Sequence, residues 1–200
     1  MLGPGDDIVA VTEKAMTDAG IEPQPDDILA ICESPLAITQ GRIRYLDEMK
    51  VGVAARILCR FFHIDSSIGT CYGMQAAIDE AGLVRVLLAF VLGSPTRLVG
   101  RRGDFYRLAG RQVAWLDDPP SALPPYTPDI VLGPHDPAAV ARRAAETFGC
   151  HAAVVDANDL GTYEIMGASP GTDLDLLGGE MTKNPQGQSN EQTPIVLVRP

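Results

Sequence analysis

The spacing of apolar residues predicts helices along much of the chain. Residues 5–20 repeat apolar side chains on one helical face, with Asp6 or Asp7 placed to cap the first turn and Gly20 placed to end the last. The same pattern predicts helices over three further segments, 51–62, 73–81 and 83–92. The last two are either separate helices or one helix disturbed at Gly82.

Short apolar runs bounded by polar or turn residues predict strands. One buried strand is expected within residues 26–34, and a hairpin over 105–118 that turns near Gly110. Further along, a strand–helix–strand unit is expected, with Asp136 as the helix cap, Pro137 in its first turn and Gly149 behind it. Its elements span 130–133, 136–149 and 151–157. A glycine- and amide-rich loop over 178–194 then leads to a last strand over 195–199.

Helices and strands alternate without a strict order, which indicates an α+β fold, a mixed sheet with packed helices. A length of 200 residues fits a single domain over 1–200, with the proline-rich segment 117–128 as a connecting loop. The chain opens almost at a helix cap and closes on a strand, which leaves open that it is a piece of a longer protein.

Charge argues against one class of partner. The formal net charge of −10 repels phosphate, so nonspecific binding of nucleic acid is not expected. The basic residues are nearly all arginine, and five of them lie within fifteen positions, at 97, 101, 102, 107 and 111. Guanidinium groups bind phosphate in bidentate fashion, so this group is either a phosphate-facing cluster or a solvated face.

Neither the cysteines nor the apolar runs indicate export or a membrane. Cys32, Cys59, Cys71 and Cys150 form no CxxC pair, no signal peptide is recognisable, and a reducing cytoplasm is therefore expected. The longest apolar run, 84–92, is too short to cross a bilayer.

A polar cluster follows the strand expected at 151–157. Asp156, Asn158 and Asp159 place three oxygen-bearing side chains within four positions, just before Gly161. Such residues either cap turns through their own backbone or hold a hard cation such as Mg²⁺, which prefers a few carboxylates beside water and phosphate oxygens. Asp79 and Glu191, each beside glycine and amide residues, are further candidates for such a site.

Several known motifs are absent. An EF-hand loop starting at Asp156 would have Leu160 at its fifth position and Gly167 at its twelfth, so that interpretation fails. The sequence contains no GxxxxGK[ST] and no GxGxxG. Its three histidines stand at no ligand spacing for zinc.

Five stretches, taken in order, resemble the coenzyme F-420 gamma-glutamyl ligases. They are GDDIVAVTEKAMTDAGIEPQPDDILAICES, LAITQGR, GMQAAIDEAG, IVLGPHDPAAVARRAAETFG, and VVDANDLG with the closing NEQTPIVLVR. The resemblance spans nearly the whole chain. It implies the fold of that family, an interlocked homodimer, and a ligase that uses GTP to make an acyl phosphate, which the amine of an amino acid then attacks.

The resemblance also implies a ligand set. Two divalent ions, Mg²⁺ or Mn²⁺, would be held by Asp79, by Asn158 and Asp159 with Asp156 nearby, and by Glu191. The residues implied to contact the nucleotide are Ser34, Arg42, Gly187, Gln188 and Gln192. The substrates would be a small-molecule carboxylate and an amino acid.

The chain departs from the family's pattern at four places. In the phosphate-facing turn, where the family has two Ser-Lys-like pairs, this chain has Glu33-Ser34 and Ala37-Ile38, so the lysine is absent. DTFG has become NDLG, Gly82 replaces an asparagine, and the strand that precedes the GDD start in the family is missing. Two hypotheses about function follow: a nucleotide- and metal-dependent amide ligase, or an inactive homologue that binds a metal or a phosphorylated ligand. A third, structural interpretation makes the acids caps and turns only.

Overall fold

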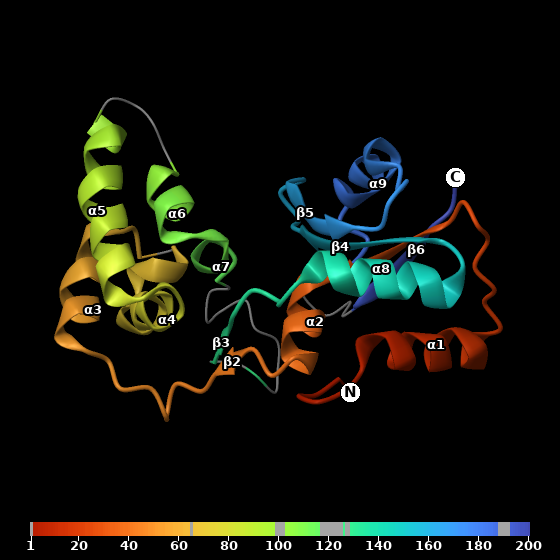
Figure 1. Ribbon diagram of the computed structural model, residues 1–200, viewed down its shortest axis with the longest axis horizontal. Helices are drawn as coiled ribbons and strands as arrows, with labels where there is room; N and C mark the ends of the chain where they lie inside the picture. Colours follow the sequence, from red (N-terminus) through yellow and green to blue (C-terminus); the bar gives the residue numbers. More distant parts are fainter. Residues whose placement is uncertain (1, 65, 99–102, 117–125, 127–128, 188–192) are drawn as a thin grey trace. The chain divides into compact units, whose positions relative to one another are not determined.

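The computed structural model describes residues 2–64, 66–98, 103–116, 126, 129–187 and 193–200. The chain forms two compact units (Figure 1). Unit 1 comprises Met1–Gly41 and Pro134–Pro200, and unit 2 comprises Arg42–Gly133, so unit 2 is an insertion into unit 1.

Unit 1 contains a mixed four-stranded sheet, which confirms the α+β prediction. Its strand order is β5-β4-β1-β6. β1 (Ile28–Cys32) runs parallel to β4 (His151–Ala157), whereas β5 (Tyr163–Ala168) and β6 (Ile195–Val198) are antiparallel to their neighbours. β1 and β4 are central and buried, which explains their nearly continuous apolar sequences.

Helices cover both faces of this sheet. On one face, Ile28, Ala30, Ala153 and Val155 pack against Leu177 and Met181 of α9 (Leu174–Met181). The alternate residues face α8 (Pro137–Phe148), which lies along β4 and β5 (Figure 1). Gly167 of β5 lies so close to the backbone of Ala138 that a side chain there would clash, so this glycine sets the helix–sheet distance.

Two helices, α1 (Ile8–Ala19) and α8, have the capping residues at both ends that the sequence predicts. α1 begins where Asp7 accepts from the Val9 N–H, and it ends at Gly20 with a φ of 65°. α8 begins at Asp136, which accepts from Ala139, with Pro137 in the first turn and Gly149 behind. Local capping chemistry therefore sets these boundaries.

Unit 2 is mainly helical. Its helices pack around a core that includes Ile68, Met74, Val86, Val113 and Leu132. The helices are α3 (Val53–Leu58), α4 (Cys71–Ala81), α5 (Leu83–Leu98), α6 (Asp104–Ala109) and α7 (Arg111–Ala114), with the 3₁₀ turns η1 (Cys59–Phe61) and η2 (Ser67–Gly69). The separate helices predicted on either side of Gly82 are confirmed as α4 and α5.

The predicted hairpin over 105–118 is wrong, because residues 104–114 form α6 and α7. The buried residues Phe105, Ala109 and Val113 recur every four positions, which is a helical period. Gly110, with a φ of 113°, separates the two helices rather than turning a hairpin.

The strand, helix and strand of the predicted unit are all confirmed, but the two strands belong to different sheets. β3 (Ile130–Val131) pairs with β2 (Ile43–Arg44) in a two-stranded ribbon of unit 2, whereas β4 joins the unit 1 sheet. The elements that were not predicted are α2 (Glu33–Thr39), β2, η2, β5 and α9. The last turn of α9 occupies the start of the expected loop over 178–194.

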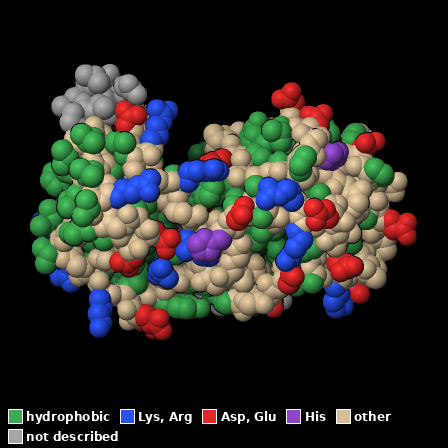
Figure 2. All heavy atoms as spheres, viewed as in Figure 1, with side chains coloured by type: hydrophobic (Ala, Val, Ile, Leu, Met, Phe, Trp, Pro, Cys, Tyr) green, Lys and Arg blue, Asp and Glu red, His purple; other side chains and the backbone are tan. Residues whose placement is uncertain are grey.

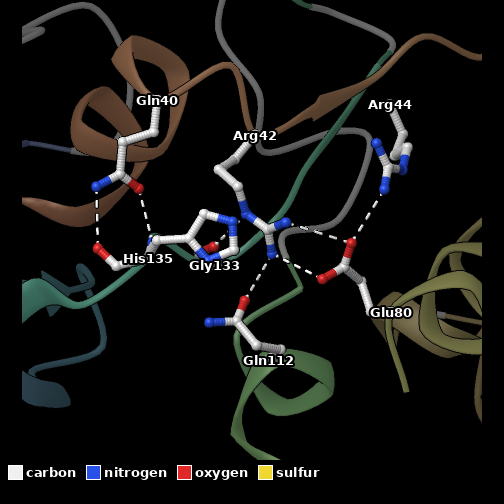
Figure 3. Close-up of polar contacts among 7 residues, drawn as sticks. All are labelled: Gln40, Arg42, Arg44, Glu80, Gln112, Gly133 and His135. Carbon is white, nitrogen blue, oxygen red and sulfur yellow. Dashed lines mark hydrogen bonds and ion pairs between the residues drawn. The ribbon is translucent and has the colours of Figure 1, made fainter. Parts of the chain in front are cut away.

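Hydrogen bonds join the two connecting segments within each unit, through a side chain in unit 1 (Figure 3) and through the backbone in unit 2. Within unit 1, the Gln40 amide donates to the His135 carbonyl at 2.9 Å and accepts from the His135 N–H at 2.6 Å. Within unit 2, Leu132 N donates to the Arg42 carbonyl at 2.8 Å and continues the β2–β3 ribbon.

Among the described residues, no helix is both long and apolar enough to cross a bilayer.

An ion pair between the buried Asp27 and the exposed Arg199 closes one end of the sheet in unit 1. Asp27 is 1% exposed, and its carboxylate accepts from Arg199 Nε at 2.9 Å, from Arg199 Nη2 at 2.7 Å and from Gln24 N at 2.8 Å. The Arg199 hydrogen bonds, followed by that from Gln24, lower the pKa of Asp27 from 3.8 to about 2.

This pair predicts a pH dependence. Because the pKa of Asp27 is lower in the native state, its contribution to stability is present above pH 3.8 and is lost as the pH falls toward 2. We expect the urea midpoint of the wild type to fall more steeply over this window than that of Asp27→Asn. Asp26→Asn, at the exposed neighbouring carboxylate, is the matched control and should follow the wild type. Parallel pH profiles for Asp27→Asn and wild type would contradict the assignment.

Candidate functional site

Three segments of unit 1 meet at one edge of its sheet. β1 and β4 are parallel, so their carboxyl ends, Cys32 and Ala157, lie at the same edge. β6 is antiparallel to β1 and begins there, where Cys32 N donates to the Pro194 carbonyl at 2.8 Å. The start of α2, the β4–β5 turn and the loop into β6 therefore share this carboxyl edge, the place where open α/β sheets bind ligands.

Asp156 faces another acid across the hairpin. It lies directly opposite Glu164 in the β4–β5 register. Asp156 as a whole residue is exposed, but nearby protein atoms displace part of the water around its carboxyl group, and this loss of hydration raises the pKa of Asp156. The negative charge of Glu164 raises this pKa further. Like charges opposite each other weaken a strand pair, and a bound cation would relieve that repulsion.

Asn158 stabilises the β4–β5 turn. Its Oδ1 accepts from Leu160 N at 3.0 Å and Thr162 N at 3.2 Å, and its Nδ2 donates to Thr162 Oγ1 at 2.5 Å. Both lone pairs of the amide oxygen are therefore in use. Of the two roles that the sequence allowed, turn capping and cation binding, Asn158 has the first in this structure. To bind a metal through its amide oxygen, Asn158 would have to break one of these hydrogen bonds.

Asp159 connects the turn to a distant loop. Its Oδ1 accepts from Asn184 Nδ2 at 2.6 Å, across 25 positions of sequence. Asn184 is 8% exposed and takes a φ of 44°, a conformation that asparagine tolerates better than most residues. The candidate carboxylate thus lies against a buried amide in the segment that follows α9.

Some side-chain amide atoms of Asn184, which contacts Asp159, and of Gln186, two positions further on, are buried without partners in the portion of the chain that the structure describes. Among the residues that the structure describes, Asn184 Oδ1 and both Oε1 and Nε2 of Gln186 are buried without a hydrogen bond. The Gln186 side chain is buried, with 3% of the residue exposed. Its backbone carbonyl does have a partner, because it accepts from Thr193 N at 3.2 Å. Because an unpaired buried amide is costly, such groups in native proteins usually meet water, an ion or a ligand.

Gly187 follows this pair directly and is half-buried, with a φ of 75° and its N–H bonded to the Asn184 carbonyl at 3.1 Å. The other predicted residues of this loop, Gln188, Glu191 and Gln192, lie outside the described residues. Sequence reasoning selected the loop for its glycine and amides but missed Asn184 and Gln186. The Asn-Pro dipeptide before Gln186 and Gly187 is a turn signal that marks the segment.

Ser34 lies at the same carboxyl edge, in the first turn of α2. It is half-buried, and its hydroxyl donates to Glu33 Oε1 at 2.6 Å. Glu33 is 7% exposed, so a buried acid lies beside Ser34 in the first turn of α2.

The remaining predicted residues belong to unit 2. Asp79 is exposed on α4, where Gln75 Nε2 donates to its Oδ1 at 2.7 Å. No group of three or more His, Cys, Asp or Glu side chains within the described part of the chain is arranged to hold a metal ion. A site shared by Asp79 and the residues of unit 1 stays a prediction.

Arg42 is 8% exposed and already has partners (Figure 3). Its Nη1 and Nη2 donate to the Glu80 carboxylate at 3.3 and 2.8 Å, Nη2 also donates to Gln112 Oε1 at 2.8 Å, and Nε donates to the Gly133 carbonyl at 3.0 Å. Arg44 joins the same Glu80 carboxylate at 3.1 Å. Binding of nucleotide by Arg42 would therefore compete with these contacts.

The arginine group at 97–111 divides into separate roles where its side chains are described. Arg107 pairs with Asp104 at 3.4 Å, and the Arg111 guanidinium lies 4.5 Å from the centre of the Trp115 ring. Arg101 and Arg102 lie outside the described residues, as does the side chain of Arg97.

Comparison with known protein families supports the resemblance seen in the sequence. The model of the F420-0:gamma-glutamyl ligase family matches residues 1–159, which include Ser34, Asp79 and the Asp156–Asp159 turn. No curated protein sequence matches the chain.

The Asp156–Glu164 pair predicts a gain in stability on loss of charge. Because the pKa of Asp156 is raised in the native state, its ionised form destabilises the fold above that pKa, and the penalty disappears as the pH falls below 3.8. Asp156→Asn should therefore melt at a higher temperature than wild type at pH 7 and show little difference at pH 3.5 or below. Glu164→Gln should act in the same direction but more weakly. A lower melting temperature for both variants at pH 7 would contradict this interpretation.

The amide of Gln186, buried and unpaired among the described residues, is expected to lower the stability of the ligand-free protein. Gln186→Leu keeps a similar volume and removes two unpaired polar atoms, so it should stabilise the ligand-free protein by roughly 1–3 kcal/mol. Urea unfolding measures this gain. Gln24→Leu, at an exposed position of the same unit, is the control and should change stability by less than about 0.5 kcal/mol. Destabilisation by Gln186→Leu would show that the amide already has a partner in the free protein.

Proposed function

The chain belongs to the F420-0:gamma-glutamyl ligase family, and on that basis we propose that it is an amide ligase. In this proposal it joins a small-molecule carboxylate to the amine of an amino acid, using GTP or another nucleoside triphosphate and a divalent cation. The observation that carries the proposal is the set of buried amide atoms, unpaired among the described residues, of Asn184, which donates to Asp159, and of Gln186, two positions further along the chain.

The chemistry explains what the site has to supply. A carboxylate oxygen of the substrate attacks the γ-phosphorus, the nucleoside diphosphate leaves, and an acyl phosphate forms. The amine nitrogen then attacks the acyl carbon, phosphate leaves, and the amine loses a proton. Phosphoryl transfer needs positioned charge more than covalent help from the protein.

The described residues fit a divalent cation in part. Asp156 and Asp159 offer carboxylate oxygens, the ligands that Mg²⁺ and Mn²⁺ prefer, and a cation would offset the repulsion between Asp156 and Glu164. Asn158 is less suited to bind the cation, because its amide oxygen already accepts two hydrogen bonds within the β4–β5 turn. When bound, the ion would neutralise phosphate charge during the transfer.

The chain's own residues have three roles in this proposal. Asn158 fixes the shape of the turn, so that the carboxylates on either side of it are held in place. Asn184 orients Asp159 through the hydrogen bond at 2.6 Å. Gln186, which offers both a donor and an acceptor, contacts the nucleotide or the substrate and pairs its amide only in the complex.

A second candidate function is binding without catalysis. It is favoured by α2, where Glu33 is buried and Ala37 stands fully buried at the position of the family's phosphate turn. A buried carboxylate repels phosphate, and no lysine offsets it there. On this alternative the chain binds a metal or a phosphorylated ligand and does not turn it over.

One experiment separates the two functions. Calorimetry with Mn²⁺ and GTP should show binding to the wild type, with affinity reduced about 10- to 100-fold in Asp159→Asn and in Asn184→Ala. Asp18→Asn, an exposed acid of α1, is the matched control and should bind as wild type does. Phosphate release in the presence of carboxylates and amino acids would identify a ligase, whereas binding without release would identify the inactive homologue. If neither GTP nor ATP binds with either metal, and no phosphate is released, both functions fail.

A further inference from the structure

Two cysteine thiols of unit 2 lie in contact with each other. Cys59 begins η1 and Cys71 begins α4, and their Sγ atoms lie 3.3 Å apart, with one thiol hydrogen-bonded to the other. Both residues are free cysteines. Two thiols at this distance, contributed by separate elements, form the arrangement from which a disulfide can close, and the ligase function proposed above uses neither of them.

Closing a disulfide here would require only a small movement. The bond is about 2.05 Å long, so the two sulfur atoms would approach each other by roughly 1.2 Å. Thr70 caps α4 by accepting from Gly73 N at 3.0 Å. A side chain at Gly73 would clash with the Ser67 carbonyl, so η2 packs directly against the backbone of α4. These contacts fix the start of α4 and, with it, the position of Cys71.

The two thiols differ in their access to solvent. Cys59 is 4% exposed and belongs to the core of unit 2, together with Leu58 and Met74. Cys71 is half-buried, at the edge of that core. Loss of hydration raises the pKa of the Cys59 thiol, and the hydrogen bond with Cys71 raises it further, so Cys59 stays protonated at neutral pH. A small oxidant therefore reaches Cys71 first.

The surroundings of the pair suit an apolar cross-link. The outer sides of α3 and η1 carry Val53, Ile57 and Phe61, which are between 52% and 74% exposed. Figure 2 shows hydrophobic side chains gathered over α3 and α5. A disulfide carries neither charge nor a polar hydrogen, so it can replace the two thiols here without leaving a polar group unpaired.

We propose that Cys59 and Cys71 form a peroxide-sensitive site, in which hydrogen peroxide oxidises Cys71 and Cys59 then closes a reversible disulfide. The Cys71 sulfur attacks one peroxide oxygen, the O–O bond breaks, and Cys71 sulfenic acid and water form. The Cys59 sulfur then attacks the Cys71 sulfur, and the hydroxyl group leaves with the Cys59 proton as a second water. Two thiols are oxidised and one peroxide is reduced. An added thiol restores both cysteines by two exchange steps and ends as its own disulfide.

The other two cysteines provide an internal control. Cys32 is the last residue of β1, whereas Cys150 immediately precedes His151, which pairs with Ile28 at the start of β1. Because a strand rises about 3.3 Å per residue, Cys32 and Cys150 lie roughly 15 Å apart along the strands, beyond the reach of a disulfide. A cross-link between these two would therefore indicate unfolding rather than a built site.

Peptide mapping of the full chain tests the proposal. Trypsin cleaves after Arg56, Arg60 and Arg85, so Cys59 leaves in the peptide 57–60 and Cys71 in the peptide 61–85. After treatment with hydrogen peroxide and alkylation of the remaining thiols, these two peptides should be joined in the wild type. Addition of dithiothreitol should separate them. Cys32→Ser, at the half-buried cysteine of unit 1, is the matched control and should give the same joined species.

Two variants test the order of the steps. In Cys59→Ala the second thiol is lost, so sulfenic acid should accumulate at Cys71, where dimedone traps it. In Cys71→Ser the buried Cys59 should react with peroxide at least about 10-fold more slowly than Cys71 does in Cys59→Ala. Circular dichroism verifies that both variants fold, and the wild-type map decides the proposal if one of them does not.

Three results would overturn the proposal: peptides 57–60 and 61–85 that stay separate although peroxide has oxidised the protein, a cross-link that joins Cys32 or Cys150 instead, or sulfenic acid that forms first at Cys59. The test requires no nucleotide, metal or turnover, so it stands or fails separately from the ligase function.

Discussion

The hydrogen bond between Asp159 and Asn184 is the interaction on which the candidate site depends. It joins the β4–β5 turn to the segment that follows α9, and it does so with a buried amide whose oxygen is left without a partner in the described structure. The neighbouring Gln186 has neither amide atom paired. A fold keeps such a group only if something compensates for the lost hydration, and a ligand bound during function is the most direct compensation.

The sheet explains why these residues come together. Parallel pairing of β1 with β4 places the start of α2 and the acidic turn at one edge, and the antiparallel β6 brings the amide-rich loop to the same edge. Residues more than a hundred positions apart in sequence are thus gathered by strand direction alone. The same edge also holds the buried acid Glu33, in the first turn of α2.

The sequence predicts those features of the structure that depend on neighbouring residues alone. The caps of α1 and α8, the buried strands β1 and β4, and the break at Gly82 follow from residue type and spacing. The sequence did not predict which strands pair with each other or which polar side chains are buried. The hairpin predicted at 105–118 is helical because its apolar residues recur every four positions, and β3 pairs with β2 rather than with β4. Asn184 and Gln186 look like ordinary loop amides until their burial is known.

The side-chain amide resonances of Asn184 and Gln186 give the most direct test of the central claim that these groups receive a ligand. On addition of Mg²⁺ and GTP, both should shift in ¹H–¹⁵N spectra as their unpaired atoms gain hydrogen-bond partners, and Gln24, exposed in the same unit, should not. Unchanged resonances for both buried amides at saturating nucleotide and metal would contradict the account.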